Sequence, residues 1–296
     1  MIAVDWGTTH IRAYLLDKNG QIQARRSGAS GVMAVEPGGF AAVLEDIVGP
    51  WLAEGAGPIV MSGMVGSRQG WLEVPYVPCP ASMAEIVAAV REVKWGNGRS
   101  ALICPGLICH DENNVPDVLR GEEIQAFGAM PGLPTGAVSL CLPGTHSKHV
   151  RMRGGFIESF ATYMTGEVFS VLRQHSILGR LMDGTDFDEI AFREGLGRAR
   201  EPGGLLHHLF GVRSRALSGE ITASAISSYL SGILIGHEVI AAKPREQIFV
   251  VGVPELCGFY MHAFEFYGHR AERIDADVAA AGLFRVWQLL AENRAA

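Results

Sequence analysis

The chain has 296 residues, of which 48% are hydrophobic and 19% are charged, and its formal net charge is −6. This acidic balance argues against nucleic acid or an anionic membrane as the main partner. No apolar run reaches the roughly 18–20 residues of a membrane span, and the N-terminus begins in a strand pattern rather than a signal peptide. We therefore expect a cytoplasmic protein.

The first elements predicted are a hairpin and its returning strand. In MIAVDWGTTHIRAYLLDKNG an apolar strand at 2–6 ends in a Gly-Thr-Thr tip, and a second strand follows at 11–16. Asn19-Gly20 is a turn signal, which places a third strand at 21–25. The rest of the first half predicts helices at 38–54 and 82–93 and strands at 58–62 and 101–104. Ser82 and Glu85 have the spacing of a capping box.

The second half opens as the first half does. AVSLCL at 137–142 breaks at Pro143-Gly144, and a strand pattern resumes from 149 to 157. The remaining predicted elements are helices at 165–178, 186–196, 219–242 and 277–292 and a strand at 248–252. Because 2–25 and 137–160 share one pattern, we infer an approximate duplication of one α/β unit.

Both tips carry residues that suit phosphate: Gly7, Thr8 and Thr9 in the first, and Gly144, Thr145, His146, Ser147 and Lys148 in the second. Backbone N–H groups at such turns can converge on phosphate oxygens, and glycine lets the phosphate come close. Facing each other across a cleft, two such loops would hold the polyphosphate of ATP, with Lys148 neutralising charge. For His146 a structural role is the alternative.

Asp5 lies within the first strand, next to the first tip. A carboxylate beside a triphosphate is repelled unless a divalent cation lies between them, usually through water. We therefore predict that Asp5 holds Mg²⁺ through water. The alternative is a strand residue that is hydrogen-bonded to a neighbouring turn.

The pattern Asp5-Trp6-Gly7-Thr8-Thr9, repeated as Pro143-Gly144-Thr145, resembles the two phosphate loops of the sugar kinase/actin/Hsp70 superfamily. Leu142-Pro143 departs from it, because an acidic residue and glycine are common there. Over residues 4 to 285 the chain resembles the 2-dehydro-3-deoxygalactonokinase family. The stretches that carry this match are VDWGTTHIRAYLLD, MSGMVGSRQGWLEVPY, VPDVLRGEEIQAFG, LPGTHSKHV, YMTGEVFSVLRQHSILG and AAAGLFR.

The resemblance implies an α/β, two-lobed, actin-like ATPase fold. In that fold a ribonuclease H-like unit is duplicated, and each lobe is a mixed β-sheet flanked by helices. We expect a first lobe at 1–134 with the first phosphate loop and the sugar-acid site. The second lobe, at 135–296, would hold the second phosphate loop and the adenosine site, and its final helix could pack back on the first lobe.

The family is taken to transfer phosphate from ATP to the terminal (C6) hydroxyl of 2-dehydro-3-deoxy-D-galactonate, in galactonate breakdown. Composition and spacing alone support only a two-lobed phosphate-handling site. A guanidinium binds a carboxylate through two parallel hydrogen bonds. Arg68, next to Ser67, is therefore our first candidate for the sugar-acid carboxylate, and Arg120 and Tyr76 are further candidates. An ion pair at the surface or between domains is the alternative for Arg68.

Glu122 and Glu123 follow Gly121 at the predicted start of a helix, where acidic residues commonly stabilise the helix end. A similar Gly-plus-acid helix start holds the activating carboxylate in exopolyphosphatases of the superfamily. One of the two acids is thus expected to be the catalytic base, with Asp117 as the substitute. The sequence does not decide between Glu122 and Glu123.

The resemblance also implies that a glycine turn at the end of a late strand lies against the adenosine. In FVVGVPEL this turn is Gly252, followed by Val253 and Pro254, although the usual double glycine is absent.

Three functions compete: a small-molecule kinase, an exopolyphosphatase-like phosphohydrolase, and a nucleotide-gated binding protein of the actin or chaperone kind. The short chain and Arg68 favour the kinase, because those hydrolases generally carry extra domains. No segment is left over for a separate partner-binding domain. The sequence leaves the oligomeric state open, a homodimer included.

The cysteines and paired histidines do not predict a metal site. Five scattered cysteines are an odd number, so reduced thiols are expected. Cys104-x4-Cys109-His110 has no second pair at zinc spacing. His207-His208 are adjacent, so on a helix they point about 100° apart and seldom bind one ion.

Overall fold

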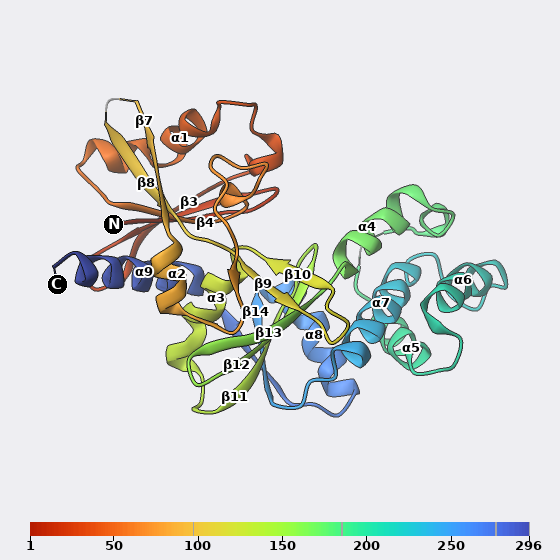
Figure 1. The fold of residues 1–296 in the computed structure, drawn as a ribbon. Helices are drawn as coiled ribbons and strands as arrows, with labels where there is room; N and C mark the ends of the chain where they lie inside the picture. Colours follow the sequence, from red (N-terminus) through yellow and green to blue (C-terminus); the bar gives the residue numbers. More distant parts are fainter. Residues whose placement is uncertain (97, 185, 276, 296) are drawn as a thin grey trace. The chain divides into compact units, whose positions relative to one another are not determined.

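The computed structural model describes residues 1–96, 98–184, 186–275 and 277–295 (Figure 1). The chain divides into two compact units, each built from segments distant in the sequence. Unit 1 consists of 1–137, 150–160 and 276–296, and unit 2 consists of 138–149 and 161–275.

Unit 1 contains a six-stranded sheet in the order β3-β2-β1-β4-β8-β7. Its strands are β1 (Ile2–Trp6), β2 (Ile11–Leu16), β3 (Ile22–Gly28), β4 (Ile59–Gly63), β7 (Arg91–Trp95) and β8 (Arg99–Ile103). β2 runs antiparallel to both of its neighbours, β1 and β3, whereas β4 runs parallel to β1 and β8 runs parallel to β4. A smaller sheet has the order β10-β9-β5, with β5 (Val77–Pro78), β9 (Leu107–His110) and β10 (Pro116–Leu119).

The alternation of side chains along β1 decides where Asp5 points. Ile2, Val4 and Trp6 belong to one apolar core cluster, which α1 (Phe40–Ala53) covers with residues at helical spacing such as Phe40 and Leu44. Burying each such side chain stabilises the fold by about 1.5–3 kcal/mol. Since successive side chains of a strand face opposite sides, Asp5 is left on the face away from this cluster.

Among the described residues, unit 1 also contains the α-helices α2 (Met83–Ala89), α3 (Glu122–Ala129) and α9 (Val278–Ala295). α3 and α9 touch backbone to backbone, because a Cβ at Gly128 would lie 1.9 Å from the Val278 oxygen and one at Gly282 would lie 2.2 Å from the Ile124 oxygen. The absence of a side chain at these two glycines therefore permits the close approach of the two helices. The final helix thus packs within unit 1.

The second large sheet contains the strand order β15-β14-β11-β12-β13. Read from β13, this order repeats β3-β2-β1-β4-β8 of unit 1, with β11 in the place of β1. The strands are β11 (Ala137–Leu142), β12 (Ser147–Arg153), β13 (Phe156–Tyr163), β14 (Gln247–Gly252) and β15 (Ala271–Asp275). β12 and β13 continue into unit 1, where β6 (Ala81–Ser82) pairs with β13. β14 runs parallel to both β11 and β15. Two mixed sheets of one strand order confirm the predicted α/β class.

The helices of unit 2 are α4 (Thr165–His175), α5 (Glu189–Ala199), α6 (Gly204–Leu217), α7 (Ile226–Ala242) and α8 (Pro254–Phe266). α5 and α7 pack through glycines, since a Cβ at Gly195 would lie 2.3 Å from the Tyr229 oxygen. Among the residues described, no helix combines the length and the apolar character needed to cross a membrane.

Most predicted elements of the sheets are confirmed, among them the strands at 2–6, 11–16 and 137–142. The capping box is also present, with the Ser82 N–H donating to Glu85 Oε2 at 2.8 Å. The helix predicted at 82–93 is wrong beyond Ala89, because residues 91–95 pair with β8. The helix predicted at 219–242 begins only at Ile226, and α6, α8 and β15 were not predicted.

Candidate active site

The end of β1 brings Asp5 to the start of α3. Asp5 pairs in register with Arg12 on β2, its carboxylate lies 3.7 Å from the Arg12 guanidinium, and its side chain is 12% exposed. Gly121, which precedes α3, has a φ of 107°. A Cβ there would lie 3.2 Å from the Gly63 Cα and 3.8 Å from Asp5 Oδ1. Glycine therefore lets the helix start approach the Asp5 carboxylate closely.

Glu122 and Glu123 open α3 in different surroundings. Glu122 is half-buried, and its Oε2 accepts the Arg120 N–H at 3.1 Å. Glu123 is fully buried, and its Oε2 accepts the Gly121 N–H at 2.6 Å. Glu123 Oε1 is buried with no hydrogen-bond partner among the described residues. The two acids that the sequence could not separate are thus distinct in exposure.

Burial and neighbouring charges shift the pKa values of Glu123 and Asp5. Burial raises the pKa of Glu123 to about 8, the neighbouring Glu122 charge adds to the rise, and the hydrogen bonds to the carboxylate oppose it. Burial likewise raises the pKa of Asp5 to about 6, opposed by Arg12 and reinforced by Glu122. At neutral pH Glu123 therefore holds a proton, while Asp5 is mostly ionised.

The first phosphate loop is held by the turn at residues 31–33. The carbonyl oxygens of Gly7, Thr8 and Thr9 accept the N–H groups of Val32, Met33 and Gly31 at 3.0, 3.2 and 3.2 Å. Thr8 and Thr9 have exposed side chains. Since the carbonyls are committed to this turn, the loop would bind an anion through its hydroxyls. The Thr8 hydroxyl could donate to an anion directly, whereas the Thr9 hydroxyl lies 2.9 Å from His10 Nδ1 and would have to be shared with that ring.

Arg68 and Arg120 differ sharply in their surroundings. Arg68 is exposed, whereas Arg120 is 8% exposed. Nη2 of Arg120 donates to the Val74 carbonyl at 2.7 Å, and its guanidinium carbon lies 4.4 Å from the centre of the Tyr76 ring. Nε and Nη1 of Arg120 are buried with no hydrogen-bond partner in the described part of the chain.

The buried hydroxyls of Ser62 and Ser67 also have no partner among the described residues. A Cβ at Gly66 would lie 2.9 Å from Arg120 Nη1, so the backbone beside Ser67 reaches the guanidinium. Asp117, the substitute base, lies half-buried on β10 in register with Cys109.

The second phosphate loop lies in unit 2, against the start of α4. The Thr145 carbonyl accepts the Glu167 N–H at 2.9 Å, and the His146 ring bonds the Glu167 carboxylate. Lys148 is buried, with its Nζ 3.3 Å from the His146 carbonyl. Ser147 is buried too, so its side chain faces the protein interior rather than solvent.

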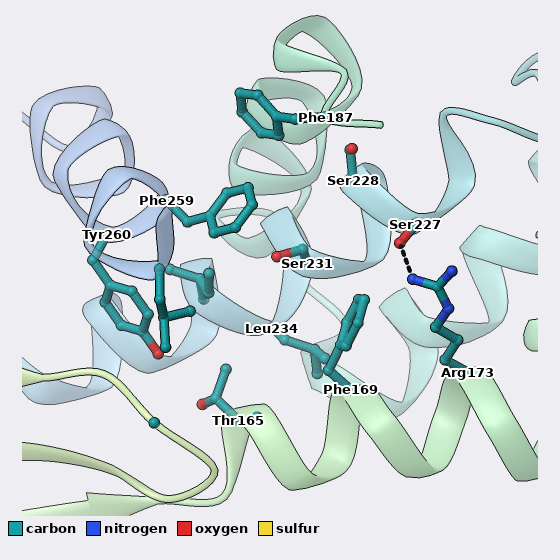
Figure 2. Close-up of a pocket in the computed structure, with 14 residues that line it drawn as sticks. Thr165, Phe169, Arg173, Phe187, Ser227, Ser228, Ser231, Leu234, Phe259 and Tyr260 are labelled. Carbon is teal, nitrogen blue, oxygen red and sulfur yellow. Dashed lines mark hydrogen bonds between the residues drawn. The ribbon is translucent and has the colours of Figure 1, made fainter. Parts of the chain in front are cut away.

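A cavity of about 230 Å³ opens beside this loop, lined by Gly144, by Thr165 and Gly166 of α4 and by parts of α7 and α8 (Figure 2). Figure 2 shows the rings of Phe169, Phe187 and Phe259 around it. α7 contributes three hydroxyls, from Ser227, Ser228 and Ser231. Ser227 Oγ accepts a hydrogen bond from Arg173 at 3.3 Å. Aromatic walls with a few polar groups suit a flat, partly polar ligand.

Gly252, Val253 and Pro254 lie just outside this lining. A Cβ at Gly252 would lie 4.0 Å from the Pro143 carbonyl, so the end of β14 adjoins the second phosphate loop. Pro254 begins α8, and the same helix supplies Leu256, Phe259 and Tyr260 to the cavity.

Comparison with known proteins identifies the family. A family model described as 2-keto-3-deoxy-galactonokinase matches residues 5–286. The chain belongs to this family. It is 35% identical to the 2-dehydro-3-deoxygalactonokinase of Escherichia coli (strain K12) over 283 residues, which cover 94% of each chain. The chain is therefore a kinase, as the sequence predicted, and its family implies ATP as the phosphate donor.

Solved structures confirm the fold of this kinase. A crystal structure described as a 2-dehydro-3-deoxygalactonokinase protein of Sinorhizobium meliloti is 35% identical, with a TM-score of 0.89 over 98% of both chains. Component A of the (R)-2-hydroxyglutaryl-CoA dehydratase of Acidaminococcus fermentans is 12% identical, with a TM-score of 0.53 over 98% of both chains. Such neighbours have the actin-like ATPase fold, which confirms the predicted fold class.

Sequence reasoning missed the cavity of the kinase. Its hydroxyls come from α7, whose sequence ISSYLSGILIGHEVIAA holds three serines among mostly apolar residues. Polar residues on a buried helix need partners or a ligand, and this signal could have drawn attention to Ser227, Ser228 and Ser231. Phe169, Phe187 and Phe259 lie on three separate segments, and only folding brings them together.

Proposed function

We propose that this kinase transfers the γ-phosphoryl group of ATP to the terminal (C6) hydroxyl of 2-dehydro-3-deoxy-D-galactonate, in galactonate catabolism. The observation that carries the proposal is the 35% identity to the E. coli enzyme of that name over 94% of both chains. A cytoplasmic location, expected from the sequence because it shows no membrane-span or signal-peptide pattern, is part of the same proposal, and free cysteines are compatible with it.

We assign Mg²⁺ to Asp5. The donor chemistry fits, because an aspartate oxygen is a ligand that Mg²⁺ accepts, directly or through water. The Glu122 charge contributes to the raised pKa of Asp5, and a cation placed here would relieve that repulsion. When bound, Mg²⁺ would supply positive charge to the phosphate oxygens. The protein itself would keep the Asp5 carboxylate ionised and directed away from the core.

We assign the catalytic base to Glu122. A base must be ionised and within reach of the substrate hydroxyl. Glu123 meets neither condition, because it is fully buried and its pKa of about 8 keeps it protonated at neutral pH. Glu122 is half-buried, and its charge lies close enough to Asp5 to raise the pKa of Asp5. Its carboxylate would take the proton of the C6 hydroxyl as the bond to phosphorus forms.

We assign the sugar-acid carboxylate to Arg120, with Ser67 beside it, rather than to Arg68. Two buried guanidinium nitrogens without a partner among the described residues are costly unless something accepts their hydrogens. A carboxylate has the shape and the charge to do so. Arg68, the first candidate from the sequence, is exposed and would pay more conformational entropy to hold a substrate.

The nucleotide assignments concern each unit separately. In unit 1, Gly7, Thr8 and Thr9 are assigned to phosphate. In unit 2, Gly144, Thr145 and His146 are assigned to phosphate with Lys148, and Ser147 only through its backbone, because its side chain is buried. The cavity beside Gly144 is assigned to the nucleoside, with Gly252, Val253 and Pro254 next to it.

The decisive experiment measures ADP formation from ATP with and without 2-dehydro-3-deoxygalactonate. ADP should form rapidly only when the sugar acid is present, and one phosphorylated sugar acid should appear for each ADP. Release of inorganic phosphate at the same rate without the sugar acid would favour the phosphohydrolase. No turnover with this sugar acid would overturn the proposed substrate.

A further inference from the structure

A chain of buried polar side chains in unit 2 connects the second phosphate loop with the wall of the cavity. The oxygens of Ser147 and Tyr260 are 2.6 Å apart, and the Tyr260 hydroxyl donates to Glu238 Oε2 at 2.7 Å. The other carboxylate oxygen, Glu238 Oε1, is 2.8 Å from His149 Nε2. The sulfur of Cys141 lies 3.8 Å from the same nitrogen.

The direction of these hydrogen bonds follows from the number of protons. Tyr260 has one hydroxyl proton, which goes to Glu238, so the Ser147 hydroxyl must donate its own proton to the Tyr260 oxygen. Glu238 then accepts from Tyr260 on one oxygen and from His149 on the other. Ser147 is fully buried and the Glu238 side chain is 1% exposed, so a broken link would leave a buried group unpaired.

The two ends of this series of hydrogen bonds lie at the residues on either side of Lys148. Ser147 and His149 are the residues before and after it, and both depend on the single carboxylate of Glu238. Glu238 belongs to α7, which supplies the cavity serines, and Tyr260 belongs to α8, where it lines the cavity next to Phe259. The loop and the cavity wall therefore share one hydrogen-bonded support.

We propose that Glu238 is a positioning residue for ATP. Through Tyr260 and Ser147 on one side and His149 on the other, it holds the second phosphate loop in register with the nucleoside cavity. This inference rests on the proposed function, because it takes the loop and the cavity as the ATP site. Glu238 touches neither substrate and acts through the residues that it orients.

A metal site is the competing reading of the same cluster. One ligand atom each from Cys141, His149 and Glu238 lies within 4.8 Å of the others, and zinc accepts all three types. However, both oxygens of Glu238 already accept hydrogen bonds, and 2.8 Å between nitrogen and oxygen is a hydrogen-bond distance. Hydrogen bonds within the cluster therefore occupy both Glu238 oxygens, and no metal ion is needed to explain the arrangement.

The test is a double-mutant cycle on the full chain, with KM for ATP, KM for the sugar acid and calorimetric affinity for a non-hydrolysable ATP analogue as readouts. Ser147→Ala and Tyr260→Phe should each raise the KM for ATP about tenfold, the effect of one lost hydrogen bond. The KM for the sugar acid should change less than twofold. The double variant should be no worse than the worse single variant, because both break one chain.

Two substitutions of Glu238 separate its hydrogen bonds from its bulk. Glu238→Leu keeps similar volume without an acceptor and should raise the KM for ATP at least tenfold. Glu238→Gln offers an oxygen to Tyr260 and an N–H to His149 Nε2, which accepts it once the ring carries its proton on Nδ1, so this variant should stay within threefold of the wild type. The matched control is Glu246→Gln, which removes a carboxylate bonded to Ser139 at 2.9 Å near the start of β11 and should leave both KM values unchanged.

Several outcomes would overturn the inference while the wild type remains an active kinase. Unchanged ATP affinity in the Ser147 and Tyr260 variants, with only a lower Tm, would show a purely structural role. Additive effects in the double variant would show that the two residues act separately. A rise in the wild-type Tm with Zn²⁺ that Cys141→Ser abolishes would assign the cluster to a metal. If Glu238→Leu fails to fold, the Ser147–Tyr260 cycle still decides. A wild type without sugar-acid-dependent turnover would instead refute the proposed function.

Discussion

Glu123→Gln should stabilise the protein at neutral pH, although it replaces a residue of the candidate site. The folded pKa of about 8 lies above the ordinary value of 4.5, so the folded chain keeps a proton that the unfolded chain releases. Below pH 4.5 both states are protonated and nothing is lost. As pH rises from 4.5 towards 8, stability falls by about 1.4 kcal/mol per pH unit, which is about 3 kcal/mol at pH 7.

Glutamine has the shape of the protonated acid and does not ionise, so the variant does not lose stability in this way as pH rises. Its oxygen can accept the Gly121 N–H as Glu123 Oε2 does. Urea unfolding followed from pH 4.5 to 8 should therefore show equal stabilities at the acid end. The free energy of unfolding of the variant should then exceed that of the wild type by an amount that grows with pH, about 3 kcal/mol at pH 7 and at most about 5 kcal/mol at pH 8.

Glu85→Gln is the control of opposite sign. The Ser82 hydroxyl and backbone N–H hold the pKa of Glu85 below its ordinary value. Ionised Glu85 therefore adds stability above that value, and its loss should destabilise the protein at neutral pH. A Glu123→Gln variant that is less stable than the wild type at pH 7, or whose difference does not change with pH, would refute the reasoning. It would mean that Glu123 is ionised in the fold.

The remaining predictions concern catalysis. Glu122→Gln should lower kcat by roughly 10²–10⁴, the contribution of a general base, whereas Glu123→Gln should stay within threefold; equal losses would remove the distinction between the two acids. Asp5→Asn should lower kcat about a hundredfold at saturating Mg²⁺ with an unchanged fold by circular dichroism, and a variant that keeps most of its turnover would exclude Asp5 from the site. Arg120→Lys should raise the KM for the sugar acid about tenfold with the KM for ATP unchanged. Arg68→Lys is its control, and an effect of Arg68→Lys as large would return the carboxylate to Arg68.

Local signals were sufficient for the strands that form each hairpin. Ile2 to Trp6 and Ile11 to Leu16 are mostly apolar and bounded by turn residues, and their limits match the structure. α6 was missed because Gly203-Gly204 and two histidines interrupt its pattern, although Leu205, Leu209 and Val212 have helical spacing and pack in one apolar cluster. The strand at 91–95 needed its partner β8 to be recognised, since pairing rather than propensity decides it.

The roles of the candidate residues depended on burial, which a single sequence does not contain. Glu122 and Glu123 are the same residue type on the same helix end, and the sequence offered no means to rank them. Helix geometry turns adjacent side chains about 100° apart, so one is half-exposed and the other fully buried. Arg68 and Arg120 show the same effect across segments, because the stacking on Tyr76 that buries Arg120 involves a residue 44 positions away.

The protonation of Glu123 also explains how three carboxyl groups can share one corner of unit 1. If Asp5, Glu122 and Glu123 were all ionised, three negative charges would be only partly compensated by the Arg12 guanidinium, 3.7 Å from Asp5, and by the Arg120 charge, which acts on Glu123. At Glu123 burial outweighs the Arg120 charge, so a bound proton costs less than a third buried negative charge. With Glu123 neutral, two negative charges remain, which one divalent cation can balance. The buried acid thus adjusts the charge of the site without touching a ligand. For this reason a neutral glutamine at position 123 should preserve turnover, whereas the same change at 122 should abolish the carboxylate to which we assign the base.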